Sequence, residues 1–135
     1  MYAAHPMPRT REDVETYLYQ LDRRFEDQNG TLLVSTGANL PPIAIQVAPP
    51  IVVFRVTIGA VPEDATHQLR LFQRLLEHNA SDLMHVSYGI EGHTVVLSGA
   101  LALDNLDINE LEATLSDLDL ALVRQAPGLF AAARS

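Results

Sequence analysis

Histidine is the residue of this chain best suited to holding a metal ion, because neutral imidazole binds zinc, copper and nickel. The spacing of the five histidines argues against a shared ion. In a predicted hairpin, His85 lies opposite Ser98 while His93 lies at the turn, roughly 15 Å away at ~3.3 Å per residue. His67 and His78 are about three turns apart on a predicted helix. The chain also has no cysteine, so we expect neither a metal site nor a cofactor.

The acidic residues gather between Asp104 and Asp119, but they lack the alternating spacing and central glycine of a calcium loop. They fit the solvated face of a helix whose first-turn acids stabilise its N-terminus. Ser98 lies in the sequence LSGA and not in the Gly-x-Ser-x-Gly motif of a nucleophile. A glycine-rich phosphate loop is also missing. We therefore predict that the protein is not an enzyme.

Composition indicates one folded domain over residues 1–135, with 47% hydrophobic and 19% charged residues. Residues 1–9 are expected to form an N-terminal extension and residues 126–135 a C-terminal tail. The net charge of -8 repels a phosphate backbone, so nucleic acid is the least favoured partner. No apolar run has the length of a signal peptide or a membrane span. We expect a cytoplasmic protein without a membrane partner.

The first half predicts one helix and three strands. Thr10 followed by Asp13 resembles a capping box and starts the helix, and Asn29-Gly30 ends it. The β-branched and alternating segments that follow predict strands at 31–36, 43–48 and 51–58, with a turn at Pro49-Pro50. On the last strand, one face carries Val52, Phe54, Val56 and Ile58.

The second half predicts a helix, a hairpin and a last helix. Pro62-Glu63-Asp64 starts the first of these helices. Its expected apolar stripe consists of Leu69, Phe72, Leu75 and Leu76. In the hairpin, a turn at Glu91-Gly92 would pair Tyr88 with Val95. The apolar face of that hairpin is expected to include Met84, Val86, Tyr88, Val95 and Leu97. Asp107 with Glu110 caps the last helix, which Pro127-Gly128 interrupts. The predicted fold is α+β, in the order α-β-β-β-α-β-β-α.

Four segments carry a resemblance to a known family. They are LRLFQRLLEHN at 69–79, VSYGIEG at 86–92, VVLSGALAL at 95–103 and LDINELEATLSDL at 106–118. In this order, the chain from about residue 10 to 122 resembles the YbjN-like family and, more distantly, the class I type III secretion chaperones of the CesT/SycE-like fold. The resemblance implies helices packed on a twisted antiparallel sheet, a bacterial homodimer, and a role in holding partner proteins.

One predicted helix carries a basic edge of His67, Arg70 and Arg74. In a dimer of the implied kind, this edge would face the second subunit, and the arginines would pair with acids there. Simple solvent exposure is the first alternative, and contact with a phosphate backbone is the second.

The candidate residues for binding a client protein lie away from the helix-packed face. They are Ile51, Val53 and Arg55 on the first hairpin, and Leu129 and Phe130 in the tail. An exposed apolar patch at these positions would mark a protein interface. The alternative is that this face of the sheet is only partly covered and has no partner. We expect a chaperone-like or adaptor protein that binds one or a few clients through this surface. The alternative function is a small-molecule-binding or regulatory domain with a pocket between the last helix and the sheet.

Overall fold

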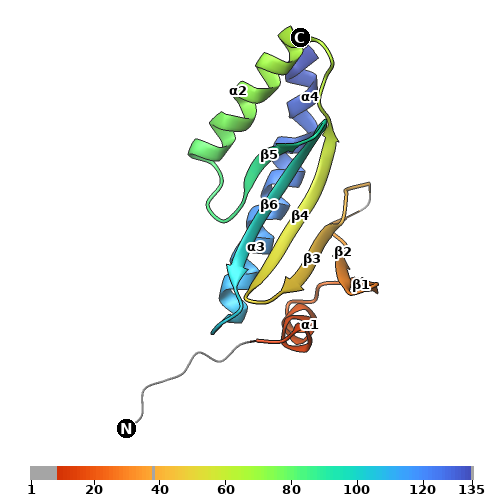
Figure 1. Cartoon of the computed structure of the whole chain (residues 1–135), viewed down its shortest axis with the longest axis vertical. Helices are drawn as coiled ribbons and strands as arrows, with labels where there is room; N and C mark the ends of the chain where they lie inside the picture. Colours follow the sequence, from red (N-terminus) through yellow and green to blue (C-terminus); the bar gives the residue numbers. More distant parts are fainter. Residues whose placement is uncertain (1–8, 38, 135) are drawn as a thin grey trace.

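The computed structural model describes residues 9–37 and 39–134 (Figure 1). The described helices are α1 (Arg11–Gln20), α2 (Ala65–Ser81), α3 (Ile108–Leu120), the π-helix η1 (Ala121–Gln125) and α4 (Ala126–Arg134). The described strands are β1 (Phe25–Gln28), β2 (Thr31–Val34), β3 (Ile43–Ala48), β4 (Ile51–Ala60), β5 (Ser87–Glu91) and β6 (Thr94–Ala102). They form one antiparallel sheet in the order β1-β2-β3-β4-β6-β5. The predicted α+β fold is confirmed.

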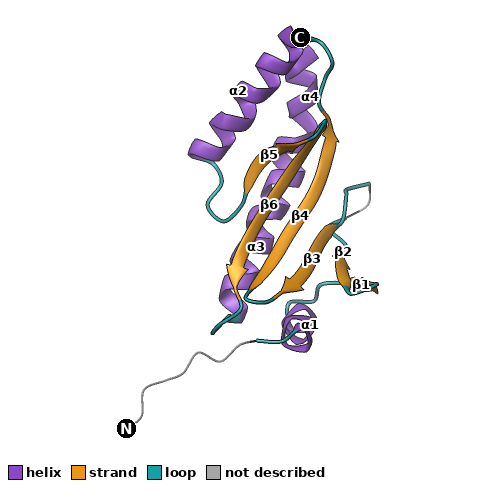
Figure 2. Cartoon of the chain, viewed as in Figure 1, coloured by secondary structure: helices purple, strands orange, loops and turns teal. Residues whose placement is uncertain are grey.

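The core lies between the helices and one face of the sheet (Figure 2). On β4, Val52, Phe54 and Val56 are buried, as the alternation predicts. The helix α3 runs along this face behind the long strands β4 and β6, while α1 lies at the end of β2 and β3 (Figure 1). At the opposite end of the molecule, α2 and α4 lie side by side. The described helices therefore pack against the buried face of the sheet.

The first helix is shorter than the sequence predicts. It begins at the expected capping box of Thr10 and Asp13 but ends at Gln20, and Asp22 then adopts a left-handed φ of 57°. Asn29 and Gly30, with φ of 52° and 93°, form the two-residue turn between β1 and β2. This pair of left-handed residues is typical of tight hairpins. The predicted helix end is therefore a hairpin turn, and the first half contains four strands.

The two later hairpins differ in how well they match the predicted register. In the first, the turn lies at Pro49-Pro50, as expected, and it places Ile45 opposite Phe54. In the second, Glu91 stays in β5, and the turn consists of Gly92 and His93. Tyr88 is therefore paired with Leu97 and not with Val95. Met84 lies before β5 and is 88% exposed, so its predicted place in the core is wrong.

The expected C-terminal tail is a helix. After the capping box of Asp107 and Glu110, α3 continues through η1, where the Ala126 amide donates to the Ala121 carbonyl five residues back. Pro127 has no N–H and lies in the first turn of α4, a position that helices tolerate. Helical structure thus continues past the predicted break at Pro127-Gly128.

Candidate protein-binding surfaces

The strand β1 forms a free edge of the sheet. In an antiparallel pair, alternate residues bond to the neighbouring strand and the others face outward. The Ser35 amide donates to the Arg24 carbonyl at 3.0 Å, so the even-numbered positions of this segment face β2. The N–H and C=O groups of Phe25 and Asp27 therefore point away from the sheet. They have no hydrogen-bond partner among residues 9–37 and 39–134, so another strand can pair here.

The opposite edge, at β5, is partly closed by side chains, because the outward backbone groups of Tyr88 are bonded while those of Ile90 have no partner among residues 9–37 and 39–134. Asn79 donates from Nδ2 to the Tyr88 carbonyl at 3.1 Å, and its Oδ1 accepts from the Tyr88 amide at 2.7 Å. Just before the strand, Asp117 accepts from the backbone amides of residues 84–86 at distances between 2.9 and 3.3 Å. Covering an edge in this way prevents unwanted pairing with another chain. The two edges of the sheet are therefore not equivalent.

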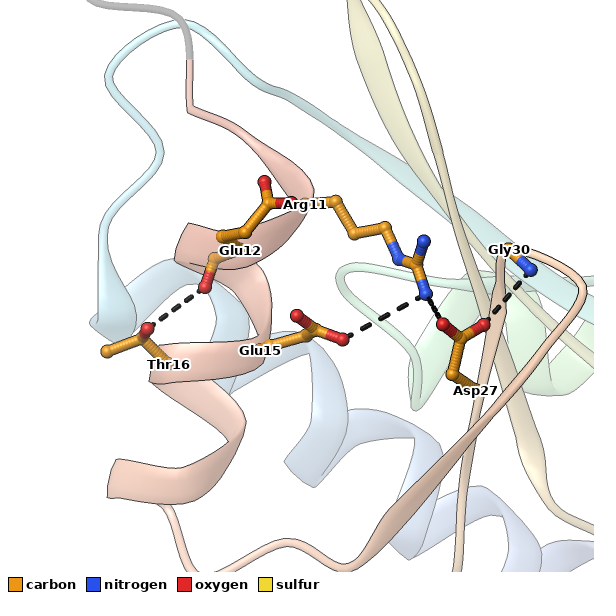
Figure 3. Close-up of polar contacts among 6 residues, drawn as sticks. All are labelled: Arg11, Glu12, Glu15, Thr16, Asp27 and Gly30. Carbon is orange, nitrogen blue, oxygen red and sulfur yellow. Dashed lines mark hydrogen bonds and ion pairs between the residues drawn. The ribbon is translucent and has the colours of Figure 1, made fainter.

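Arg11 joins α1 to the hairpin at the free edge (Figure 3). Its guanidinium pairs with Asp27 and lies 3.9 Å from a Glu15 oxygen. The second carboxylate oxygen of Asp27 accepts from the Gly30 amide at 3.0 Å. The hydrogen bond from Arg11, followed by that from Gly30, lowers the pKa of Asp27 below its usual value. This contact holds α1 beside the free edge.

An aromatic pair lies between α1 and the start of β1. Tyr19 and Phe25 meet edge to face with ring centroids 5.1 Å apart, and Tyr19 is 71% exposed. Both rings line an open depression of about 840 Å³. Arg24 also lines it and has no ion-pair partner in the described part of the chain, whereas Arg23 pairs with Asp119. Apolar ring surface thus lies next to unpaired backbone groups.

The helix α2 carries two apolar stripes. Leu71 and Leu75 face the core, whereas Leu69 and Leu76 are 69% and 67% exposed. With Phe72, these two exposed leucines line a second open depression. The expectation that Leu69 and Leu76 face the core is wrong, because the core-facing residues Leu71 and Leu75 lie about a third of a turn around the helix from them. An exposed stripe of this kind is typical of a protein interface.

The predicted basic edge lies on α2. Arg70 and Arg74 are exposed and have no ion-pair partner among the described residues. The Nδ1 atom of His67 lies 3.2 Å from a carboxylate oxygen of Asp64, the N-cap residue of the helix. At helical spacing, Arg70 and Glu77 border the exposed apolar stripe on the same side.

The second face of the sheet presents Ile51, Val53 and Arg55 in one row along β4. In the register of β4 and β6, Ile51 lies opposite Ala102 and Val53 opposite Ala100, which gives a flat apolar strip. Arg55 reaches across β6 and pairs with Glu91 on β5. The structure therefore brings these predicted residues together on the open face. Their role in binding a partner stays a prediction.

Leu129 and Phe130 are placed differently from the sequence expectation. Leu129 is 1% exposed, and Phe130 packs against the core. A Cβ atom at Gly59 would lie 2.8 Å from the Phe130 ring, so the glycine makes room for it. The expected exposed apolar tail is therefore wrong, because α4 turns both side chains inward.

Residues 9–37 and 39–134 contain no group of three histidine, aspartate or glutamate side chains able to hold a metal ion. Within the same residues, none of the helices combines the length and apolar character needed to cross a membrane. Between α3 and the sheet, Leu111, Leu115 and Leu118 are fully buried with Phe54. Apolar side chains fill the position of the ligand pocket considered above.

Sequence reasoning missed the free edge and the exposed stripe of α2. The turn pair Asn29-Gly30 between Phe25 and Thr31 is a hairpin signal, but it also suits the end of a helix. On α2, apolar residues recur at 69, 72, 76 and 80 in addition to 71 and 75, which is more than one core-facing stripe requires.

A family model described as CesT_Tir_1 matches residues 7–135. The chain belongs to the CesT_Tir_1 family. This confirms the expected kinship with YbjN-like and CesT-like proteins. A search of curated proteins finds no match.

Solved structures similar to this member of the CesT_Tir_1 family share its fold. One is a chain of the heterodimeric ExoU–SpcU complex from the type III secretion system of Pseudomonas aeruginosa, with 23% identity, a TM-score of 0.68, and coverage of 86% of this chain and 97% of that one. YbjN from E. coli, described as a candidate transcription regulator, has 12% identity and a TM-score of 0.65, with 88% and 93% covered. The Yersinia pestis type III secretion chaperone SycH, in complex with a fragment of YscM2, has 18% identity and a TM-score of 0.57, with 85% and 94% covered.

Proposed function

We propose that the chain is a homodimeric, non-enzymatic chaperone-like or adaptor protein that holds an extended segment of a partner protein. The observation that carries this proposal is the difference between the two sheet edges. The outward backbone groups of Phe25 and Asp27 are free among the described residues, whereas Asn79 occupies those of Tyr88. Pairing of an added strand supplies affinity through the main chain. The resemblance to SycH, solved with a fragment of YscM2, supports this role.

The exposed stripe of α2 supports a dimer. If two copies of α2 pack antiparallel about a twofold axis between residues 73 and 74, Arg70 of one copy lies level with Glu77 of the other. The twofold axis then produces two identical ion pairs beside the apolar contact of Leu69, Phe72 and Leu76. This charge pattern favours a second copy as the occupant of the stripe. Of the residues predicted for the dimer interface, Arg70 borders this stripe, whereas His67 and Arg74 lie on the far side of α2 from it.

The open sheet face is a second candidate surface for the same partner. Ile51 and Val53 continue as an apolar strip onto β6, and the Arg55–Glu91 ion pair bounds it at one end. A client segment that leaves the β1 edge would reach this strip by crossing β2 and β3. Its contribution would be smaller than that of the edge, because small side chains such as Ala100 and Ala102 offer little area to bury.

Two measurements test the proposed function. Light scattering of the purified chain should give twice the subunit mass of 14.8 kDa, and a monomer at micromolar concentration would contradict the dimer. A nuclease-treated pull-down from the native lysate, read by mass spectrometry against a tag-only control, should enrich one protein near equal stoichiometry. An empty pull-down together with a small molecule retained in native mass spectrometry would favour the ligand-binding alternative.

A further inference from the structure

The free edge of β1 has a definite charge pattern. Along the sequence Phe25-Glu26-Asp27-Gln28, the side chains alternate between the two faces of the sheet. Phe25 and Asp27 point toward α1, where Tyr19 and Arg11 contact them. Glu26 points toward the open face, and it has no ion-pair partner among the described residues. The edge therefore presents an aromatic surface on the face toward α1 and one unpaired carboxylate on the open face.

A second copy of the chain is a poor occupant of this edge. If two β1 strands paired antiparallel through the outward groups of Phe25 and Asp27, Glu26 of one copy would lie opposite Glu26 of the other. Like charges directly opposite each other destabilise a strand pair. The acidic edge thus discourages self-pairing while leaving its backbone groups available to a chain of different charge.

We propose that the partner segment held at this edge is an extended stretch in which apolar residues alternate with basic ones. Its apolar side chains face Tyr19 and Phe25, and a lysine or arginine lies opposite Glu26. The net charge of -8 on the chain also attracts basic segments during encounter. This inference rests on the proposed addition of a strand to β1, and it specifies the chemical class of the segment that is added.

The neighbouring charges limit where the basic residue can lie. On the face of Glu26, Gln28 is neutral, and Arg24 is a cation two residues before it. A second basic residue opposite Arg24 would be repelled, so one cation is favoured and a polybasic run is not. On the face toward α1, Asp27 is already bound by Arg11 and Gly30, so that side requires no charge from the partner.

The test uses capped nine-residue peptides that alternate threonine and valine, with the central threonine kept or replaced by lysine or glutamate. Binding to the full chain is measured by titration, and amide shifts in ¹⁵N NMR spectra show whether β1 is the site. The lysine peptide should bind most tightly and the glutamate peptide most weakly. Their affinities should differ about fivefold, because an opposite-charge pair across two strands is favourable and a like-charge pair is unfavourable. Glu26→Lys should reverse the order, and Glu26→Gln should abolish it.

A matched control and the remaining outcomes distinguish the preference for a basic residue from the strand addition on which it rests. Glu63→Lys makes the same charge change at an exposed residue between β4 and α2, and the order of the peptides should not change in this variant. Equal binding of all three peptides at β1 would overturn the charge selection and leave strand addition standing. If no peptide perturbs β1, strand addition at this edge is wrong, and the inference is overturned with it.

Discussion

Asn79 hydrogen-bonds to both backbone groups of Tyr88, so the side-chain amide takes the place of a neighbouring strand. The asparagine comes from the C-terminal part of α2 and Tyr88 from near the start of β5. One residue thus fixes the helix against the strand and occupies one of the positions at which a further strand would bind.

Replacing Asn79 with alanine should destabilise the protein. The change removes both hydrogen bonds and leaves the amide and carbonyl of Tyr88 unpaired, so the free energy of unfolding should fall by about 1–3 kcal/mol. Urea denaturation followed by circular dichroism measures this. Asn109→Ala, at an exposed position of α3, is the control and should lie close to wild type. Equal stability of the two variants would show that Asn79 does not hold β5.

Proline at residue 27 should block partner binding without removing a hydrogen bond of the sheet. Asp27→Pro deletes an amide that points outward, and edge strands tolerate proline at such positions. Asp27→Ala keeps the amide and loses the same ion pair with Arg11. We expect the alanine variant to capture the partner in a pull-down and the proline variant to lose it. Capture by both would argue that the main chain of β1 is not the binding edge.

Aspartate at Leu76 should convert the proposed dimer into a folded monomer. Leu76 is 67% exposed in the single chain, so a charge there disrupts contact with a second copy rather than the core. Light scattering measures the mass, and circular dichroism checks the fold. Val123→Asp, at an exposed apolar residue of η1, should remain dimeric. In the same assay, Arg70→Glu should weaken the dimer, and adding Glu77→Arg should restore it.

Aspartate at Phe130 should lower stability and not only partner binding. The ring packs against the core beside Gly59, so a buried charge and a lost aromatic side chain should cost about 3 kcal/mol. Thermal unfolding followed by circular dichroism measures the loss. Arg124→Asp, at an exposed position of η1, should change the melting temperature little. A wild-type melting temperature for Phe130→Asp would mean that α4 is not anchored by this ring.

Alkaline pH should destabilise the fold partly through Tyr88. Burial raises the pKa of Tyr88 above its usual value, and its hydroxyl donates to Oε1 of Gln125 at 2.8 Å. A folded-state pKa above the unfolded one gives stability that is complete below pH ~10 and is lost as the pH rises further. Tyr88→Phe should therefore show a shallower decline above pH ~10 in urea denaturation. A decline as steep as in wild type would assign the alkaline loss to other groups.

Local signals in the sequence predicted much of the fold. The capping boxes at Thr10 and Asp107 and the turn at Pro49-Pro50 depend on neighbouring residues alone, and all three occur as expected. Asn29-Gly30 was ambiguous, because the same left-handed pair ends a helix or closes a hairpin. Pairing with β2 decides between the two, and that pairing requires partners that periodicity does not reveal.

The candidate surfaces were harder to predict than the fold. Helical periodicity places Leu69, Leu71, Leu75 and Leu76 on α2, but which pair faces inward depends on where α4 packs. That packing follows from the π-helix before Pro127, where one longer turn lets the helix continue past the proline. Leu129 and Phe130 therefore became core residues, while the free backbone groups at β1 carried no side-chain signal at all.

The partly closed edge at β5 also bears on polymerisation. A sheet whose two edges are both open can join the last strand of one molecule to the first strand of the next, and such a head-to-tail contact repeats without limit into a fibre. Here the β1 edge of one molecule finds Asn79 already bonded at the β5 edge of another. This amide side chain therefore obstructs head-to-tail addition at Tyr88 while the β1 edge stays exposed for binding.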